Sequence, residues 1–503
     1  MQSEPNTHAS VASETADDTE KLSAGNRLLG LPSATLVVAA SMIGAGIYTT
    51  SGFSLASLGS PATVIWAWIV GGVIAISGAI TYGGLAARYA ESGGEYLFLA
   101  RGVHPAAGMM AGWVSLLAGF TGAMAFAAST FESHLRLWSS PLIDAMPQGA
   151  FAVGLIVIAA LIHATSLRGG AWTQDAVVIA KLLMIALFLG LAFSVRSLWL
   201  GLQEPALPEP GVVEQAGATH WWPGALAFAS ALTWISLSYS GFNGAVYLSE
   251  QIKQPRRNVP RAMLLGTTLV TVLYVLLNLV FMYLPSADQV TGQQDIAART
   301  AESLGERLTS QGLAIGQWVG PMTRVMIILG LITSVLALTQ TGPRVYQKMS
   351  SDGLMPAILR GKSAETGSEI NSTETLDDNG LSGSNRQTGQ NDPLPRIAIA
   401  LQACLASVVV LTTRLSDLLG YLGFTLSLCA AICGMLSLWV GRKSDLKIRV
   451  WGHPWVPLLY LGGTLTVLSL TALRSPAQAL VGLGTLAVGL VFWAAWGRRN
   501  PIK

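Results

Sequence analysis

Two interruptions of apolar runs and one lysine are the features of this 503-residue sequence whose residue types could do chemistry. Ile43 to Tyr48 interrupts an apolar run over 34–58, and Tyr239 to Gly244 interrupts another over 222–249. A helix unwound inside an apolar environment frees N–H and C=O groups that need partners, so such a break lines a protected cavity. Paired breaks in two halves of a membrane chain are typical of a transporter's substrate site.

The two ends of each break carry opposite polarity. A helix N-terminus attracts anions and a helix C-terminus attracts cations. A ligand with a carboxylate and an ammonium group on adjacent atoms, as in an α-amino acid, would satisfy both ends. The alternative is that these glycines serve close helix packing, since pairs of small residues are frequent in membrane helices. The sequence holds 54 glycines, so either motif alone leaves both interpretations open.

Lys181 is the one Lys or Arg placed well inside a predicted membrane span, and no Asp or Glu accompanies it at similar depth. A charge there costs about 2.5–3.5 kcal/mol on the insertion scale, so the residue is a candidate for function. Asp175 lies six residues earlier, about 9 Å along a helix. The Lys181 side chain could therefore instead extend to the inner interface.

The elements that position these groups are membrane helices. The chain is 51% hydrophobic and 11% charged, against roughly 25% charged residues in soluble domains. Apolar runs of about 20 residues, the length that crosses a bilayer, predict about twelve helices. They cover 33–58, 62–87, 105–130, 149–167, 173–195, 223–249, 261–284, 320–346, 396–413, 416–440, 455–472 and 477–497.

Basic residues gather on one side of the predicted bundle. With the N-terminus inside, 22 of the 30 Lys and Arg residues fall on the inner side, seven on the outer side, and Lys181 within a span. Cytoplasmic loops of membrane proteins carry such an excess. The sequence therefore predicts an integral protein of a cell membrane, plasma or inner, with cytoplasmic N- and C-termini. The net charge of +3 requires no nucleic acid as a partner.

Two segments are polar and of low hydrophobicity. Residues 1–25 lack the basic and apolar regions of a secretory signal and are predicted to form a disordered cytoplasmic tail. Residues 361–393 are rich in Ser, Thr, Asn and Gly, which predicts a flexible cytoplasmic insertion, either idle or regulatory.

Groups that could carry catalysis are not clustered within the predicted spans. A membrane-embedded enzyme would need neighbouring His, Asp, Glu or Cys residues. Cys404, Cys429 and Cys433 all fall inside predicted spans, and the last two lack the nearby His or acidic residues of a metal site. His163 could be a second titrating group, but a lone histidine inside a span is more often a hydrogen-bonded packing residue. We therefore expect no chemical catalysis, no cofactor and no metal.

Four segments together resemble the signatures of one known family. They are Ile43 to Tyr48, Tyr89 to Tyr96 with its Ser-Gly-Gly-Glu-Tyr, Tyr239 to Pro260, and Arg344 to Pro356. Each is weak alone, but four in this order and at these helices resemble the amino acid, polyamine and organocation superfamily, and within it the L-type amino acid transporter group. The resemblance extends over residues 28–499.

The resemblance implies an all-α membrane protein with about 12 transmembrane helices in a LeuT-type fold. Residues 26–195 would form a first five-helix repeat and 196–440 an inverted second one, followed by two appended helices and a C-terminal tail in 441–503. The broken first and sixth helices would meet near the midplane, and rocking of one helix group would alternate access to them.

The resemblance also implies a substrate site. The substrate carboxylate would bind backbone amides around Ala45, and its ammonium group would bind carbonyls near Ile43 and Tyr239. The predicted substrate-binding residues are Ile43, Gly44, Ala45, Gly46, Ile47, Tyr239, Ser240, Gly241 and Phe242. Lys181 is predicted to be the proton-coupling residue, since some sodium-independent members of this fold carry a lysine on the fifth helix.

The predicted gating residues are Leu237, Glu250, Arg257 and Arg344, although charged inner loops are also typical of a plain topology signal. Leu237 departs from the family, because many relatives have a bulky aromatic gate there. The outer loop over 130–149 lacks the cysteine that joins some members to a heavy chain. We therefore expect no disulfide-linked partner subunit.

The sequence thus predicts a secondary active transporter of amino acids, working by proton symport or by exchange within the lipid bilayer. Neutral amino acids are expected because no acidic residue lines either break in the sequence, whereas a cationic substrate would need one. The alternatives are a polyamine or cationic amino acid permease and a non-transporting amino acid sensor.

Overall fold

The computed structural model describes residues 29–138, 141–165, 167–195, 221–293, 295–360, 395–442 and 450–497. The tail predicted over 1–25 and the insertion predicted over 361–393 lie outside these ranges. The helices are α2 (Leu31–Met42), α3 (Ala45–Leu58), α4 (Pro61–Arg88), α5 (Glu95–Gly102), α6 (Pro105–Val114), η1 (Ser115–Gly122), α7 (Ala123–Arg136), α8 (Pro141–Asp144), α9 (Ala150–Thr165), α10 (Leu167–Ser194), α13 (Trp221–Ser238), η2 (Gly244–Gln251), α14 (Pro255–Tyr283), α15 (Ala287–Val290), α16 (Ile296–Ser310), α17 (Gly316–Ser351), η3 (Ala357–Arg360), α18 (Arg396–Thr412), α19 (Leu415–Arg442), α20 (Trp455–Arg474) and α21 (Pro476–Ala495).

The predicted helical class is confirmed. Among the described residues, eight helices are long and apolar enough to span a membrane, and the bent pair of α2 and α3 adds a ninth span. Three shorter apolar helices, in α9, α13 and α18, account for the remaining predicted spans. The chain is therefore an integral membrane protein built from the helices that the apolar runs predict.

Several helix ends follow from local residue chemistry. Proline occupies the start of α4, α6, α14 and α21, where its missing N–H and fixed φ cost nothing. At the C-terminal end of α3, Gly59 adopts a left-handed φ of 67° and terminates the helix.

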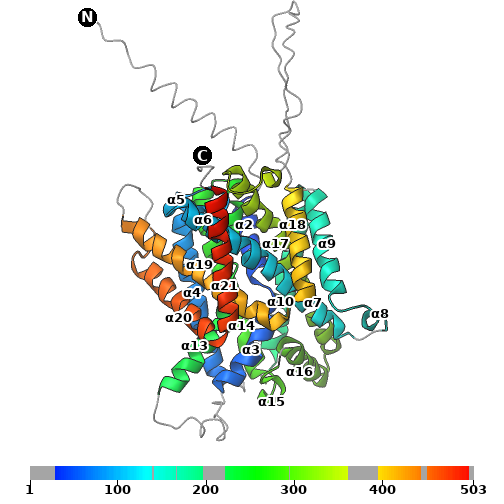
Figure 1. Cartoon of the computed structure of the whole chain (residues 1–503). Coiled ribbons are helices and arrows are strands. Elements are labelled where there is room, and N and C mark those ends of the chain that lie inside the picture. The colour runs from blue at the N-terminus through cyan, green and yellow to red at the C-terminus, as the bar shows by residue number, and fades with distance from the viewer. Residues whose placement is uncertain are drawn as a thin grey trace, which may run out of the picture.

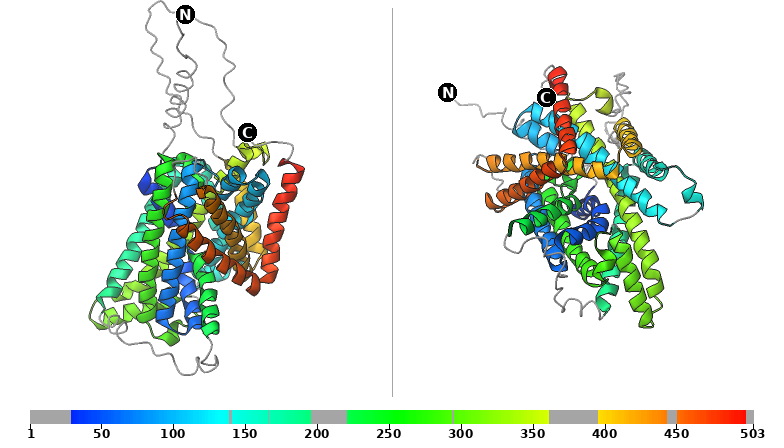
Figure 2. Two further views of the ribbon diagram at one scale, coloured as in Figure 1. Left: turned by 90° about the vertical axis from the view of Figure 1, so that its left-hand side faces the viewer. Right: turned by 60° about the horizontal axis from the view of Figure 1, so that its bottom comes forward.

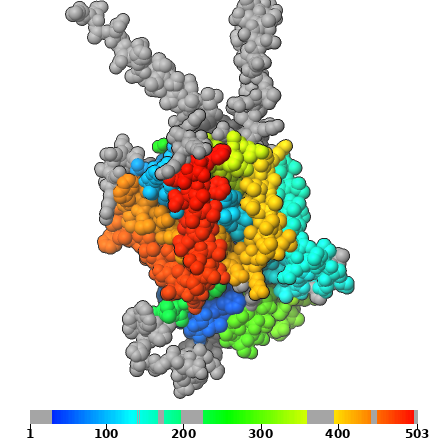
Figure 3. All heavy atoms as spheres, viewed as in Figure 1, coloured from blue at the N-terminus to red at the C-terminus, as the bar shows by residue number. Residues whose placement is uncertain are grey.

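The helices form one bundle with a distinct periphery (Figure 1). α9 and α18 lie side by side at one edge, and α20 packs on α4 at the opposite edge. Figure 2 shows that α20 and α21 stay on the outside of the bundle in two further views. In the space-filling view, α21 and α18 cover most of the centre of the front face (Figure 3). α3 and α13 emerge at the lower end of the bundle in this view, whereas residues 37–40 of α2 are buried.

Small residues allow the central helices to approach closely. A Cβ added to Gly83 of α4 would lie 3.2 Å from the Cβ of Pro260 in α14, and one added to Gly266 of α14 would lie 2.7 Å from Val38 of α2. Such close approach is how membrane helices gain packing contacts. α14 is thereby held against both α2 and α4.

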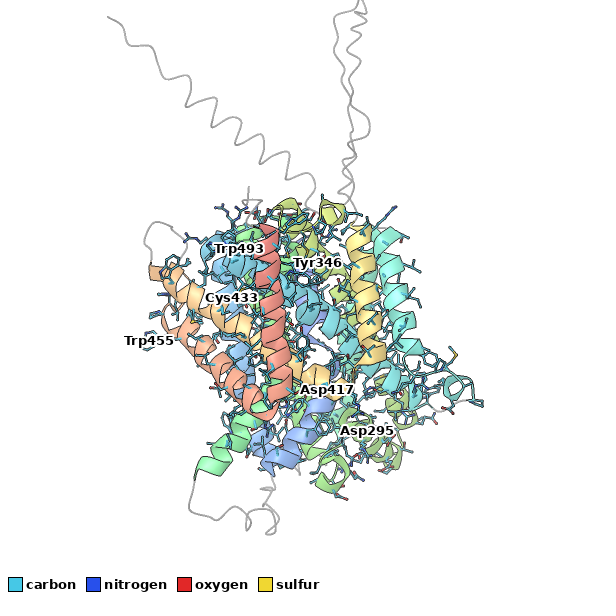
Figure 4. All side chains as sticks on the ribbon, viewed as in Figure 1. Asp295, Tyr346, Asp417, Cys433, Trp455 and Trp493 are labelled. Atoms are coloured by element: carbon cyan, nitrogen blue, oxygen red, sulfur yellow. The ribbon has the colours of Figure 1, made fainter. Side chains whose placement is uncertain are left out.

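The two ends of the bundle can be told apart by labelled side chains. Tyr346, near the end of α17, lies toward one end of the bundle, and Asp295, just before α16, lies at the other (Figure 4). We call the Tyr346 end the inner side and the Asp295 end the outer side, following the orientation that the charge count predicts.

Candidate functional site

The first interruption lies between α2 and α3. α2 ends at Met42, α3 begins at Ala45, and the two axes are bent by 43°. Gly44 has extended backbone angles, and no side chain caps the first turn of α3. The first N–H groups of a helix have no partner within it. The amides at the start of α3 can therefore receive an anion, with the helix dipole favouring negative charge there.

The carbonyl groups of this break are already engaged by the protein. Tyr274 Oη donates to the Met42 carbonyl at 2.7 Å, and Lys181 Nζ donates to the Ile43 carbonyl at 3.1 Å. Ser334 Oγ makes a longer contact of 3.4 Å with the Ile43 carbonyl. The first break thus presents free amides more readily than free carbonyls.

The second interruption lies between α13 and η2. α13 ends at Ser238 and the short helix η2 starts at Gly244. Gly241 lies between them with a φ of 97°, and its Cα is so close to α2 that an added Cβ would lie 2.6 Å from the Ser41 carbonyl oxygen. Only glycine fits both the left-handed backbone and this contact. The two breaks are therefore in direct contact.

A cavity of about 690 Å³ lies between the breaks. Seven of the nine predicted substrate-binding residues line it: Gly44, Ala45, Gly46, Tyr239, Ser240, Gly241 and Phe242. Ile43 and Ile47 do not line it, and their side chains are fully buried. Leu237, predicted to be a gate, also lines the cavity.

Aromatic groups shape one wall of the cavity. Phe242 makes edge contacts with Tyr82 of α4 and Tyr460 of α20. Tyr239 packs on Trp68, and its hydroxyl donates to the Trp68 carbonyl at 3.0 Å. The hydroxyl of Tyr239 is thus bonded within the protein, while the residue lines the cavity.

Lys181, on α10, is fully buried beside the first break. Besides the Ile43 carbonyl, its Nζ donates to Thr333 Oγ1 of α17 at 2.8 Å. Thr333 in turn donates to the carbonyl of Gly330. The side chain therefore points to the break, and not toward the inner interface that Asp175 would have offered.

The inner side of the bundle holds a charged cluster centred on Lys348. Its Nζ lies 2.6 Å from Glu91, and 3.8 Å from both Glu250 and Asp352. Tyr96 Oη also donates to Asp352 at 2.6 Å. This cluster joins the loop before α5, the end of η2 and the end of α17.

Of the three charged residues predicted to act as gates, one belongs to this cluster and two lie outside it. Glu250 belongs to it, whereas Arg344 donates to Gln347 one turn earlier on α17 and Arg257 lies exposed at the start of α14. Sequence reasoning missed Lys348, Glu91 and Asp352 as its members. The signal was available, because each lies in one of the segments that resemble the family, but nothing in the sequence pairs them.

Glu95, at the first position of α5, is the second group that sequence reasoning missed. It lines the cavity between the breaks and is 7% exposed. Its Oε1 accepts from Asn243 Nδ2 at 2.6 Å, and its Oε2 accepts from Tyr247 Oη at 2.7 Å. The premise that no acidic residue lines either break is therefore wrong, because the fold brings a carboxyl group from another segment to the second one.

Among the residues that the structure describes, no group of three or more His, Cys, Asp or Glu side chains could hold a metal ion. Cys429 and Cys433 are buried and free, and Cys404 is exposed. His163 is buried on α9, but its Nε2 has no hydrogen-bond partner among the described residues, so the predicted hydrogen bond is not found at this atom.

Comparison with known proteins places this chain in one family. The family model for amino acid permeases matches residues 29–493. Large neutral amino acids transporter small subunit 2 of Rattus norvegicus is 24% identical over 505 residues, covering 97% of this chain and 86% of that protein. Asc-type amino acid transporter 1 of Mus musculus is 23% identical, covering 92% and 81%. The b(0,+)-type amino acid transporter 1 of Mus musculus is 26% identical over 298 residues, covering 58% and 57%. The chain belongs to the amino acid permease family, which is a family of transporters and not of enzymes.

Proposed function

We propose that this chain is a secondary transporter that carries neutral α-amino acids across the membrane by alternating access to the cavity between its two broken helices. The observation that carries the proposal is the contact of the two breaks at Gly241, which puts unpartnered amides and unwound backbone around one cavity of about 690 Å³. That volume is within the usual range for small-molecule sites. The matched relatives are named as transporters of amino acids.

The substrate carboxylate would bind at the start of α3, on the amides of Ala45, Gly46 and Ile47. The ammonium group would bind mainly at the second break, near the carbonyls of Tyr239 and Ser240. The reason is that side chains of the protein already occupy the carbonyls of Met42 and Ile43. The substrate side chain would then extend into the part of the cavity lined by Phe242 and Leu237.

Recognition of both charged groups can be tested by equilibrium binding to the purified protein. A neutral amino acid should compete with a radiolabelled one, whereas its methyl ester and its decarboxylated amine should each bind about tenfold or more weakly, because each loses charge-assisted hydrogen bonds. Equal binding of the ester would contradict the assignment of the α3 amides.

Lys181 is the coupling residue in this proposal. A protonated Nζ holds the Ile43 carbonyl at the first break, and loss of the proton removes the positive charge next to that break. Proton binding and the conformation of the break would then be linked. Exchange of one amino acid for another is the second mode, and there Lys181 would only stabilise the break.

A cationic amino acid is the second candidate substrate, and Glu95 in the cavity wall favours it. The carboxylate is, however, engaged by Asn243 and Tyr247. Competition by arginine and lysine against a neutral amino acid decides between the two. Stronger binding of the cationic pair would establish the second candidate. A non-transporting sensor would bind ligand without moving it.

We also propose that the chain lies in a cell membrane with its N-terminus inside, and that it acts without a disulfide-linked partner. The charge distribution supports the first statement, and the lack of cysteine over 130–149 supports the second. The words "small subunit" in the names of some relatives concern those proteins.

A further inference from the structure

The loop before α5 and the first turn of α5 attach the inner half of the second broken helix to the rest of the bundle. Ser92 Oγ accepts from the backbone N–H of Glu250 at 3.1 Å. Gly94 packs directly on the ring of Tyr247, with no room for a Cβ. Glu95 then binds Asn243 and Tyr247. Opening of the cavity toward the inner side therefore requires η2 to leave these partners.

Glu95, Asn243 and Tyr247 form a closed ring of hydrogen bonds. Asn243 Nδ2 donates one hydrogen to Glu95 Oε1 and the other to Tyr247 Oη, at 2.8 Å, and Tyr247 Oη donates to Glu95 Oε2. The hydroxyl of Tyr82 and the backbone N–H of Glu95 also face the carboxylate. A carboxylate accepts about four hydrogen bonds. Its acceptor capacity is thus used within the protein, which argues against a subsite for a cationic ligand.

The ring fits both protonation states of Glu95. When the carboxyl group carries a proton, its O–H can donate to Tyr247 Oη, whose own hydrogen rotates away, while Asn243 still donates to Oε1. What differs between the two states is the burial of an unbalanced negative charge. Such burial is costly unless a cation pairs with the charge.

The groups that face Glu95 supply no such cation. They are the hydroxyls of Tyr82 on α4, Tyr247 on η2 and Tyr460 on α20, and the thiol of Cys429 on α19. Burial raises the pKa of the Glu95 carboxyl, against the lowering effect of the hydrogen bonds from Tyr247 and Asn243. No ion pair to Glu95 is present among the residues that the structure describes.

We propose that Glu95 is a proton-binding positioning residue of the transport cycle, whose protonated form holds η2 in place and whose ionised form favours opening of the cavity toward the inner side. The direction of this effect follows from the thermodynamic linkage between proton binding and conformation. A group with a higher pKa in the closed state than in a hydrated, open state favours the closed state when it is protonated. This stabilisation is complete below the open-state pKa and is lost as the pH rises through the closed-state pKa. The inference deepens the proposed function, on which it rests.

A native thiol offers a direct readout that needs no substrate. Cys429 lines the cavity beside Glu95. In a Cys404→Ser, Cys433→Ala background, the rate at which a membrane-impermeant thiol reagent labels Cys429 from the inner side reports how often the cavity opens there. Glu95→Gln mimics the protonated residue. The exposed outer-side acid Glu302 provides the matched control as Glu302→Gln.

We expect wild type and Glu95→Gln to label at similar rates at about pH 4, just below the ordinary pKa of a Glu side chain of about 4.3. The ratio of the wild-type labelling rate to the Glu95→Gln rate should then rise with pH. For one proton the rise is at most about tenfold per pH unit. Taking the ratio cancels the thiol ionisation that both proteins share. A negative charge on Glu95 disfavours the thiolate of Cys429, so it can only slow labelling of the wild type, against the expected rise. Glu302→Gln should stay at a ratio of one to wild type throughout. A Glu95→Gln ratio that stays at one, or an inversion with faster labelling of Glu95→Gln, would overturn the proposal.

If Glu95→Gln does not fold, or if Cys429 does not react, the inference can be tested by hydrogen exchange of the η2 backbone amides in the wild type. The exchange rate of the η2 amides should increase with pH more steeply than that of the α16 amides, which report the intrinsic pH dependence of exchange. An equal increase in both helices would contradict the inference. Labelling and exchange are both measured without substrate. Uptake without this pH dependence would refute the role of Glu95 alone, and this pH dependence without any uptake would refute the proposed function alone.

Discussion

Substitution of Gly241 by alanine should weaken substrate binding by separating the two broken helices. An added Cβ would lie 2.6 Å from the carbonyl oxygen of Ser41 and 2.8 Å from its carbonyl carbon. Both atoms belong to the backbone of α2, so a side-chain rotation cannot relieve the contact. The second break must then move away from the first.

The expected magnitude has two parts. Alanine at a left-handed φ such as the 97° of Gly241 costs about 1–2 kcal/mol. Forcing extra volume into a packed site costs about a further 1–3 kcal/mol. If the protein relieves the steric cost of about 1–3 kcal/mol by separating the two breaks, that energy is lost from substrate binding. Substrate affinity should then fall by about 5- to 150-fold.

Substitution of Gly312 by alanine provides the control for the backbone-strain cost. Gly312 has a φ of 80°, and an added Cβ would meet nothing within 4 Å. Gly312→Ala should therefore show the loss of thermal stability from backbone strain without a change in affinity. Binding of a radiolabelled neutral amino acid, measured beside the Tm of each variant, separates the two effects. Equal affinities of the Gly241→Ala and Gly312→Ala variants would refute the claim that the two breaks form one site.

Three further predictions concern the rest of the bundle. Glu132→Gln should lower the stability of the protein by about 1–3 kcal/mol, seen as a lower Tm, because Glu132 accepts from the amides of Gly149 and Ala152 and from an arginine; an unchanged Tm would contradict this. Lys348→Gln should accelerate hydrogen exchange of η2, because it breaks the pair with Glu91 and the contact with Glu250 of η2, whereas Arg324→Gln, which breaks an exposed outer pair, should not; equal effects of the two would argue against a latch. The protein purified from its native membrane should migrate at the same position on gels with and without reductant, and a shift to a larger species without reductant would establish a disulfide-linked partner.

The helices of this fold were largely predictable from the sequence, because each span is a local apolar run of the length that a bilayer demands. The predicted run 455–472 corresponds to α20 at Trp455–Arg474, and the run 396–413 to α18 at Arg396–Thr412. Breaks were predictable for the same reason, since the glycines that cause them are adjacent in the chain. The division into two five-helix repeats stays a prediction.

The pairing of groups across the bundle was not predictable in this way. Glu95 and Asn243 are 148 positions apart, and Lys181 and Ile43 are 138 apart. A single sequence gives the depth of Lys181 in its helix but not the direction of its side chain. It likewise gives charges in the inner loops without showing that Lys348, and not Arg257 or Arg344, lies among three carboxylates.

Uptake of a panel of radiolabelled amino acids into proteoliposomes, with and without an inward proton gradient, tests the central claim most directly. Wild type should accumulate neutral amino acids, with uptake driven by the gradient and the gradient effect lost in Lys181→Ala. Stimulation only by amino acid loaded inside would make the protein an exchanger and leave Lys181 as a structural support of the break. Failure of the wild type to move any member of the panel would contradict the account.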